Sequence, residues 1–293
     1  MPERDSVARQ LREVAVSHMW RGEAAEALAV YDHALEVAES DDVRELLVIG
    51  KAEALLACEQ EGREIQDLAK IVMRRRSPLH VYQAAAVLMR RYDEVDNAKA
   101  IFYGEIARDA AMELGDSVTL ARLLNNLGIV MTTASRFAEA IQTFEQGLVA
   151  LAGQEVEGPA GLLRPTLLAN LGGAKVLNDD FASGISLLEG ALPSLTADYA
   201  RAEAFADLTL GYLQSEEYEK AEEYGRQALE LASGRRQVRN ANHLLGELMR
   251  RLERYDEAAQ FFEVVASFYP EGSNIRGLLM SVDLTAVVNW KGC

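Results

Sequence analysis

The chain has 293 residues and is acidic, with 46 Asp and Glu against 30 Lys and Arg and a formal net charge of −16 at pH 7. Such a charge repels phosphate groups, so we expect neither nucleic acid nor an anionic membrane as a partner. No apolar run reaches the length of a membrane span, and the first residues lack the basic and apolar parts of a secretory signal. These features predict a cytoplasmic protein.

Residues that could carry chemistry are scattered along the chain. Cys58 and Cys293 lie far apart, and the four histidines have no cysteine or second histidine at ligand spacing. The sequence lacks a nucleophile elbow, a phosphate-binding loop and a His-Glu-x-x-His motif. We therefore expect no enzyme activity, no cofactor and no metal, and an enzyme with an unrecognised site is the less favoured alternative.

The sharpest pattern lies between Leu123 and Phe144. Gly128 is a small residue in a leucine-rich stretch, and Ala140 is a second small residue that follows twelve positions later. Phe137 precedes Ala140 by three positions, and Phe144 follows it by four. This spacing predicts two amphipathic helices joined by a tight turn, with the small residues at the closest contact between them.

The same unit recurs along the chain at spacings of 34 to 44 residues. The position of the second-helix small residue is occupied by Ala27, Glu64, Ala98, Ala140, Gly184, Ala221 and Ala258. Twelve residues earlier, in the first helices, stand Ala15, Ala52, Ala86, Gly128, Gly172, Thr209 and Gly246. A fixed period of this length is typical of a repeat protein built from helical hairpins.

This pattern resembles the tetratricopeptide repeat, in the long-helix variety of bacterial peptide-sensing regulators and kinesin light chains. The forms Leu-Asn-Asn-Leu-Gly at 124–128 and Leu-Ala-Asn-Leu-Gly at 168–172 carry the resemblance. It implies an all-α, right-handed superhelical solenoid of about seven helical hairpins, forming one domain over 1–293 with a C-terminal capping helix over 274–290. The expected repeats are 7–40, 44–75, 79–115, 120–152, 164–196, 201–233 and 238–270.

Prolines and glycines indicate where helices begin and where connectors lie. Pro78 and Pro165 are expected to open first helices, and Pro270 to follow the last hairpin. The Gly- and Pro-rich segment 153–161 is expected to be an enlarged connector, with a hinge as the alternative. For the terminal helix, the alternatives to capping are an element inserted in a groove and a homodimer contact through Val287, Val288 and Trp290.

The resemblance also implies a binding groove on the first-helix face, at set positions around each small residue. The candidate groove residues are Arg12, Gln83, Arg90, Arg91, Asn125, Asn126, Ile129, Asn170, Leu210, His243, Arg250 and Arg251. Apolar residues lie in the middle of this set and basic residues on its flanks, which favours an acidic peptide with an apolar centre. Asparagine amides can bond a peptide backbone, although inter-helix hydrogen bonds explain Asn126 and Asn170 equally well.

We therefore expect a protein- or peptide-binding adaptor that uses its concave groove. The alternative is a signal-sensing regulator that binds a peptide and controls a partner by a change of curvature. Neither the partner nor the pathway follows from the residues, because this scaffold serves many functions.

Overall fold

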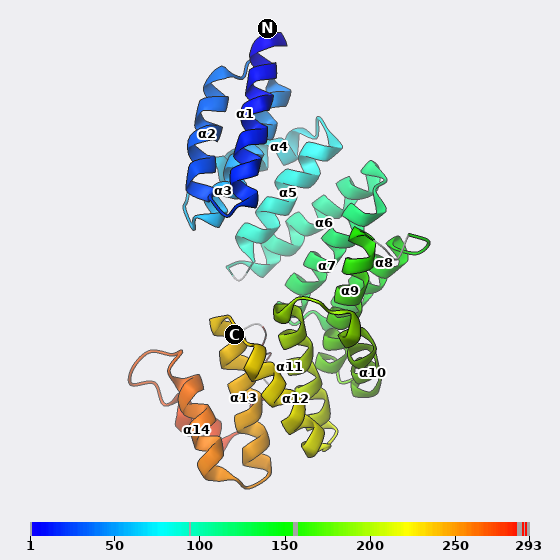
Figure 1. Cartoon of the computed structure of the whole chain (residues 1–293), viewed down its shortest axis with the longest axis vertical. Helices are drawn as coiled ribbons and strands as arrows, with labels where there is room; N and C mark the ends of the chain where they lie inside the picture. Colours follow the sequence, from blue (N-terminus) through cyan, green and yellow to red (C-terminus); the bar gives the residue numbers. More distant parts are fainter. Residues whose placement is uncertain (1, 94, 155–157, 286–288, 290, 292–293) are drawn as a thin grey trace. The chain divides into compact units, whose positions relative to one another are not determined.

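The computed structural model describes residues 2–93, 95–154, 158–285, 289 and 291. Within these residues the chain forms fifteen α-helices, one short 3-10 helix and no strand (Figure 1), which confirms the predicted all-α class. No helix of the described part is long and apolar enough to cross a bilayer.

The helices follow one another with short connections. Their bounds are α1 Pro2–Trp20, α2 Ala24–Val37, α3 Asp41–Ala57, α4 Glu64–Arg74, α5 Pro78–Tyr92, α6 Asn97–Leu114, α7 Ser117–Thr133, α8 Phe137–Ala150, α9 Pro159–Leu177, α10 Phe181–Ala191, η1 Leu192–Ser194, α11 Asp198–Gln214, α12 Tyr218–Leu231, α13 Arg235–Arg251, α14 Tyr255–Ala266 and α15 Ile275–Ser281.

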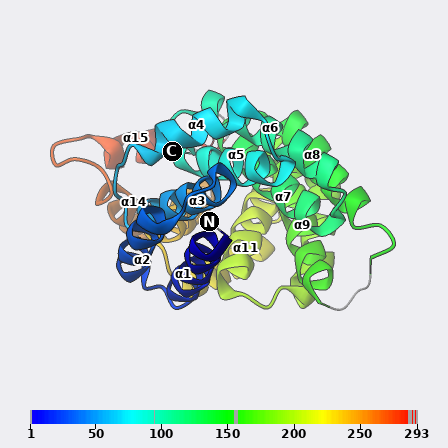
Figure 2. The same ribbon diagram turned by 90° about the horizontal axis from the view of Figure 1, so that it is seen from above.

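By its contacts the chain divides into two compact units, Met1–Leu123 and Leu124–Cys293, with the boundary inside α7. In the first unit α1 packs on α2 and α3, and α3 packs on α5 (Figure 2). In the second unit α9 packs on α11, and α11 packs on α13 (Figure 1). The first helices α1, α3, α5, α9, α11 and α13 thus each contact their hairpin partner and the first helix of a neighbouring hairpin. One face of each unit is therefore lined by first helices.

Close helix contacts occur where the repeat pattern places small residues. Ala140 and Ala258 are fully buried. A Cβ atom added to Gly128 would lie 2.4 Å from Cε1 of Phe144, and one added to Gly246 would lie 2.4 Å from Cε1 of Phe262. In both hairpins a second-helix phenylalanine ring packs directly on the first-helix backbone, as the spacing predicted.

Most hairpins close through the same turn. The turns at 21–23, 134–136, 178–180, 215–217 and 252–254 each hold their middle residue at a positive φ, and only Gly22 among these is a glycine. The N–H of the last turn residue donates to a carbonyl five positions back, as from Arg136 to Met131 at 2.8 Å. This six-to-one bond with a left-handed residue is the Schellman motif, which satisfies carbonyls at a helix end.

The third hairpin differs from this rule, and our register for it was wrong. Residues 93–96 separate α5 from α6, one residue more than in the standard turn. As a result Ala100 is fully buried, whereas Ala98 is exposed and Ala86 only half-buried. The assumed spacing of twelve residues fails here because the turn is longer.

In the second hairpin Glu64 is the first residue of α4, whereas the small residue Ala140 is the fourth residue of α8, so the assumed register is wrong here as well. Glu64 is 6% exposed, and its Oε1 lies 2.7 Å from Nζ of Lys51 on α3. Lys51 also binds Asp32 of α2 at 2.8 Å. The buried carboxylate is tolerated because it is paired, as buried charges require.

Two expectations about helix ends are corrected. Pro78 does open α5, but Pro165 lies inside α9, which begins at Pro159. Pro165 is the seventh residue of α9, beyond the first turn, so it removes one intrahelical N–H bond from this helix. The connector, expected at 153–161, therefore spans 151–158 and ends three residues earlier than predicted; its residues 155–157 lie outside the described part.

The terminal helix is also shorter than the predicted 274–290. α15 ends at Ser281, and Val282 has extended backbone angles. Beyond it the Asp283 carboxylate accepts the N–H of Thr285 at 2.9 Å and the Thr285 hydroxyl at 2.6 Å. Such a side-chain turn competes with helix formation. Val287, Val288 and Trp290, the expected dimer contact, lie outside the described residues.

Candidate functional site

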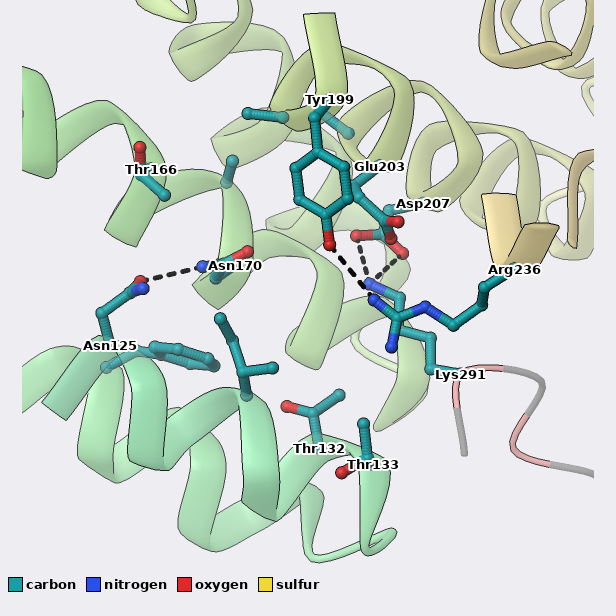
Figure 3. Close-up of a pocket in the computed structure, with 15 residues that line it drawn as sticks. Asn125, Thr132, Thr133, Thr166, Asn170, Tyr199, Glu203, Asp207, Arg236 and Lys291 are labelled. Atoms are coloured by element: carbon teal, nitrogen blue, oxygen red, sulfur yellow. Dashed lines mark hydrogen bonds and ion pairs between the residues drawn. The ribbon is translucent and has the colours of Figure 1, made fainter. Parts of the chain in front are cut away.

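A cavity of about 240 Å³ opens on the first-helix face of the second unit (Figure 3). Its walls come from the C-terminal half of α7, the middle of α9 and the first half of α11, with one residue each from α8, α13 and the C-terminal residues after α15. The lining residues are Asn125, Ile129, Thr132, Thr133, Phe144, Thr166, Ala169, Asn170, Tyr199, Ala200, Glu203, Ala204, Asp207, Arg236 and Lys291.

One wall carries a pair of amides. Asn170 Nδ2 on α9 donates to Asn125 Oδ1 on α7 at 2.8 Å. Asn125 in turn contacts Asn126 at 3.4 Å. Asn170 thus makes the inter-helix hydrogen bond that was one of its two interpretations. Both side chains of the pair also line the cavity. The pair ties two neighbouring first helices together at the edge of the site.

The opposite wall is a polar cluster from α11 and α13. The Arg236 guanidinium donates to the Tyr199 hydroxyl at 3.1 Å. The Gln237 amide donates to both the Tyr199 carbonyl and the Glu203 carboxylate, each at 3.1 Å. Because these bonds hold the side chains in place, the wall presents fixed polar groups to the cavity.

At the end of this wall lies an ion pair between Asp207 and Lys291. Asp207 is 2% exposed, and Lys291 Nζ is 2.7 Å from each of its carboxylate oxygens. Burial raises the pKa of Asp207 to about 6, although the Lys291 charge opposes that rise. A buried carboxylate of this kind depends on its cation for stability.

Gly173 provides the room for this pair. A Cβ atom at Gly173 would lie 2.1 Å from Asp207 Oδ2 and 3.3 Å from Lys291 Nζ. In the equivalent position of the preceding repeat stands Ile129. Because Gly173 of α9 has no side chain, the ion pair of Asp207 and Lys291 fits beside the α9 backbone.

Comparison with known proteins bears on the fold. No family model and no curated protein sequence matches the chain. Its structure is similar to a tetratricopeptide repeat protein from Parabacteroides merdae, at 12% identity and a TM-score of 0.61, covering 95% of this chain and 98% of that one. The chain has the tetratricopeptide-repeat fold.

Two further structures with this fold are similar over nearly the whole chain. A Rap protein complexed with Competence and Sporulation Factor matches at 14% identity and a TM-score of 0.67, covering 96% of this chain and 79% of that one. PilF of Pseudomonas aeruginosa matches at 16% identity and a TM-score of 0.52, covering 95% and 99%.

The tetratricopeptide-repeat register brings part of the predicted groove set together. Asn125, Ile129 and Asn170 all line the cavity, and Asn126 is adjacent. Leu210 does not line it, because the side chain is 3% exposed within the core of the second unit. The apolar floor of the cavity comes instead from Ile129, Ala169 and Ala204.

Other predicted residues of the second unit lie along α13, outside the cavity lining. Arg250 and Arg251 both bind Glu247, and Arg251 also binds Asp283 at 2.7 Å. His243 is largely buried, and its Nε2 has no hydrogen-bond partner among the described residues. Burial lowers the pKa of His243 to about 4. This part of α13 is an internal charge network.

The predicted residues of the first unit are likewise engaged. Arg12 binds Glu13 at 3.1 Å, Arg90 binds Glu53, and Arg91 binds Glu61 at 2.9 Å. Gln83 is half-buried on α5. The arginines were expected to form basic flanks, and each has a carboxylate neighbour within the same unit.

Several cavity residues were not predicted. Asp207 could have been found as a lone carboxylate in the apolar stretch Phe205–Leu210, because an isolated acid there must be buried with a partner. Lys291 lies outside the repeat pattern, so no spacing points to it. Among the described residues no group of three or more His, Cys, Asp or Glu could hold a metal ion.

Proposed function

We propose that this chain is a peptide- or protein-binding scaffold, and that its second unit holds an extended segment of the partner at the cavity. The observation that carries the proposal is the cavity itself, which combines apolar walls with fixed hydrogen-bonding groups on the first-helix face. Such a mixture is typical of recognition sites, where apolar contact supplies affinity and a few polar groups supply orientation.

The size of the cavity favours a side chain over a small-molecule ligand. Its volume of about 240 Å³ lies below the roughly 300–1,000 Å³ of small-molecule sites. One anchoring side chain fits such a space while the rest of the segment lies across the helices. The Rap structure, complexed with a factor, supports the idea that this fold can hold a partner.

The groups that line the cavity determine which charge the partner carries, and the arginine–carboxylate ion pairs of this chain do not. Arg90, Arg91 and Arg251 each bind a carboxylate of this chain. These paired arginines therefore exert only a weak electrostatic attraction on an acidic ligand. That attraction was the reason to expect an acidic peptide. A sensing regulator remains the alternative, and it would use the same cavity.

The test compares two substitutions of apolar residues by glutamate. Ile129→Glu places a charge inside the cavity, whereas Val149→Glu places one on α8 at a side chain that is 72% exposed. Partners captured from the native lysate are quantified by mass spectrometry and then titrated by calorimetry. We expect capture to be lost with Ile129→Glu and kept with Val149→Glu. Equal capture by both variants would move the binding surface away from the cavity.

A further inference from the structure

The chain's own C-terminal residues cross the first-helix face of the second unit. We call residues 282–285 together with Asn289 and Lys291 the terminal segment. Asp283 binds Arg251 on α13, and the Thr285 hydroxyl accepts a bond from the Gln214 amide on α11 at 3.1 Å. Lys291 binds Asp207 on α11, and Asn289 contacts α7. The segment therefore passes from α13 over α11 to the end of α7.

Asn289 is held by the carboxyl end of α7. Its Nδ2 donates to the carbonyls of Thr132 and Thr133 at 2.8 and 3.2 Å, and to Ser135 Oγ at 3.1 Å. Carbonyls in a last helical turn lack some of their intrahelical partners and accept such bonds readily. The side-chain oxygen of Asn289 accepts the N–H of Lys291 at 3.1 Å, which sets the two anchors in a compact turn.

Lys291 fills the polar end of the cavity (Figure 3). Its side chain is 15% exposed, and that of Asp207 is 3% exposed. The cation that contacts Asp207 is Lys291, which lies outside the repeat helices, at 2.7 Å. A carboxylate placed this deep, with Gly173 leaving space beside it, forms a receptor for a compact ammonium group.

We propose that the cavity of the second unit is a site for a lysine side chain of a partner segment, and that the terminal segment is its intramolecular occupant. The proposal rests on the proposed function and names the chemistry of its ligand. The partner presents an ammonium group to Asp207 and an asparagine amide, two residues earlier, to the end of α7. To bind, it must displace Lys291 and Asn289.

The probe is a fluorescent synthetic peptide, Asp-Leu-Thr-Ala-Val-Val-Asn-Trp-Lys, which copies residues 283–291. Fluorescence anisotropy measures its binding to the full chain as wild type, as Lys291→Gln, and as Lys291→Gln with Asp207→Asn. Lys70→Gln is the matched control, because it removes a lysine from an exposed pair with Asp67 in the first unit.

We expect Lys291→Gln to bind the peptide at least about tenfold more tightly than wild type, because an occupied site lowers the apparent affinity by the fraction that is open. Lys70→Gln should match wild type. Adding Asp207→Asn, or replacing the peptide's lysine by glutamine, should reverse that gain. Adding Gly173→Ala to Lys291→Gln should also weaken peptide binding, because the new Cβ atom crowds the Asp207 carboxylate.

Contrary outcomes are distinct. If Asp207→Asn leaves peptide binding by the Lys291→Gln chain unchanged, the lysine site is overturned. If Ile129→Glu abolishes that binding, the proposed function still stands. Absence of peptide binding by every folded variant would overturn the inference, and the lysate capture would then judge the proposed function separately. Dimers of the wild-type chain that the peptide dissociates would place the segment in a second copy and overturn its intramolecular role. Circular dichroism verifies that each variant is folded.

Discussion

Ala140 lies where α8 meets α7, and it has no exposed surface. The phenylalanine four positions later packs on the backbone of Gly128, so the two helices are in direct contact there. A larger side chain at Ala140 has no space to occupy unless the helices move apart.

Ala140→Leu should therefore lower the free energy of unfolding by about 1–3 kcal/mol, the usual cost of overpacking a core. The matched control is Ala138→Leu on the same helix, where the side chain is exposed. Thermal and urea denaturation measure the difference. Equal stability of the two variants would contradict the helix contact described above.

His243 predicts a pH dependence of stability. The pKa of His243 falls from 6.5 to about 4 because burial disfavours the charged imidazolium; nearby Asp283 opposes this fall, and Arg239 contributes to it. The unfolded chain binds a proton below pH 6.5, whereas the folded chain does so only near pH 4. Stability from this residue is therefore present at neutral pH and is lost as the pH falls through that window.

Between pH 7 and pH 4.5, we expect the wild type to lose about 2–3 kcal/mol more stability than His243→Gln. Glutamine does not titrate, so the difference between the two proteins isolates the imidazole from the many carboxylates. Urea denaturation at both pH values gives the four free energies. Parallel pH profiles of the two proteins would show that His243 titrates normally.

At the scale of the element, the α3/α4 hairpin contains a buried ion pair between its two helices. Glu64 is buried and Lys51 is its cation. Lys51→Met should leave that carboxylate without its partner and destabilise the chain by roughly 1–3 kcal/mol. Lys70→Met, which breaks the exposed pair with Asp67, should cost no more than about 1 kcal/mol. Chemical denaturation compares them, and a similar effect of both substitutions would argue against a buried role for Glu64.

The existence of the helices could be predicted from the sequence because most hairpins repeat a small residue at their closest contact. The third hairpin departs from the spacing of twelve residues because its turn, residues 93–96, is longer and moves the buried small residue of α6 to Ala100. The assumed period does not give the length of that turn. The end of α15 was missed because the Asp283 side chain competes for backbone N–H groups. That competition depends on local geometry and does not show in hydrophobic periodicity.

The candidate site was predicted in part for the same reason. Asn125, Ile129 and Asn170 occupy repeated positions, so the register alone places them on the first-helix face. Lys291 belongs to no repeat, and its pairing with Asp207 joins residues 84 positions apart. Contacts made by a segment outside the period cannot be derived from the period.

At the scale of the whole molecule, the net charge of −16 does not describe the groups that face the cavity. Arg236 and Lys291 stand there beside Glu203 and Asp207, so both signs are present on one wall. The positions of these individual charges therefore determine recognition at the cavity. The net charge affects solubility and the approach of distant partners.

The left-handed turn residues offer a test that spans the chain. Ser135, Asp179, Glu216 and Glu253 hold φ near +60°, from 60° to 64°. Side chains are disfavoured in this region, whereas glycine is not. Exchange of Asp179, Glu216 or Glu253 to glycine should each raise the free energy of unfolding by about 0.5–1 kcal/mol, and the three gains should add because the turns are far apart in sequence. Ser135 is kept, because its hydroxyl accepts a bond from Asn289. Denaturation of the single and triple variants measures this, and a triple variant no more stable than the parent would contradict it.

The shared turn also bears on how such an array changes its length. Five hairpins close through three residues with one left-handed centre and one six-to-one bond. A duplicated copy of any of them carries this joint with it, so the array can gain or lose a hairpin while the surfaces of its helices diverge independently. The joint at 93–96 is one residue longer, and a copy of the third hairpin would bring its own longer spacing into the array.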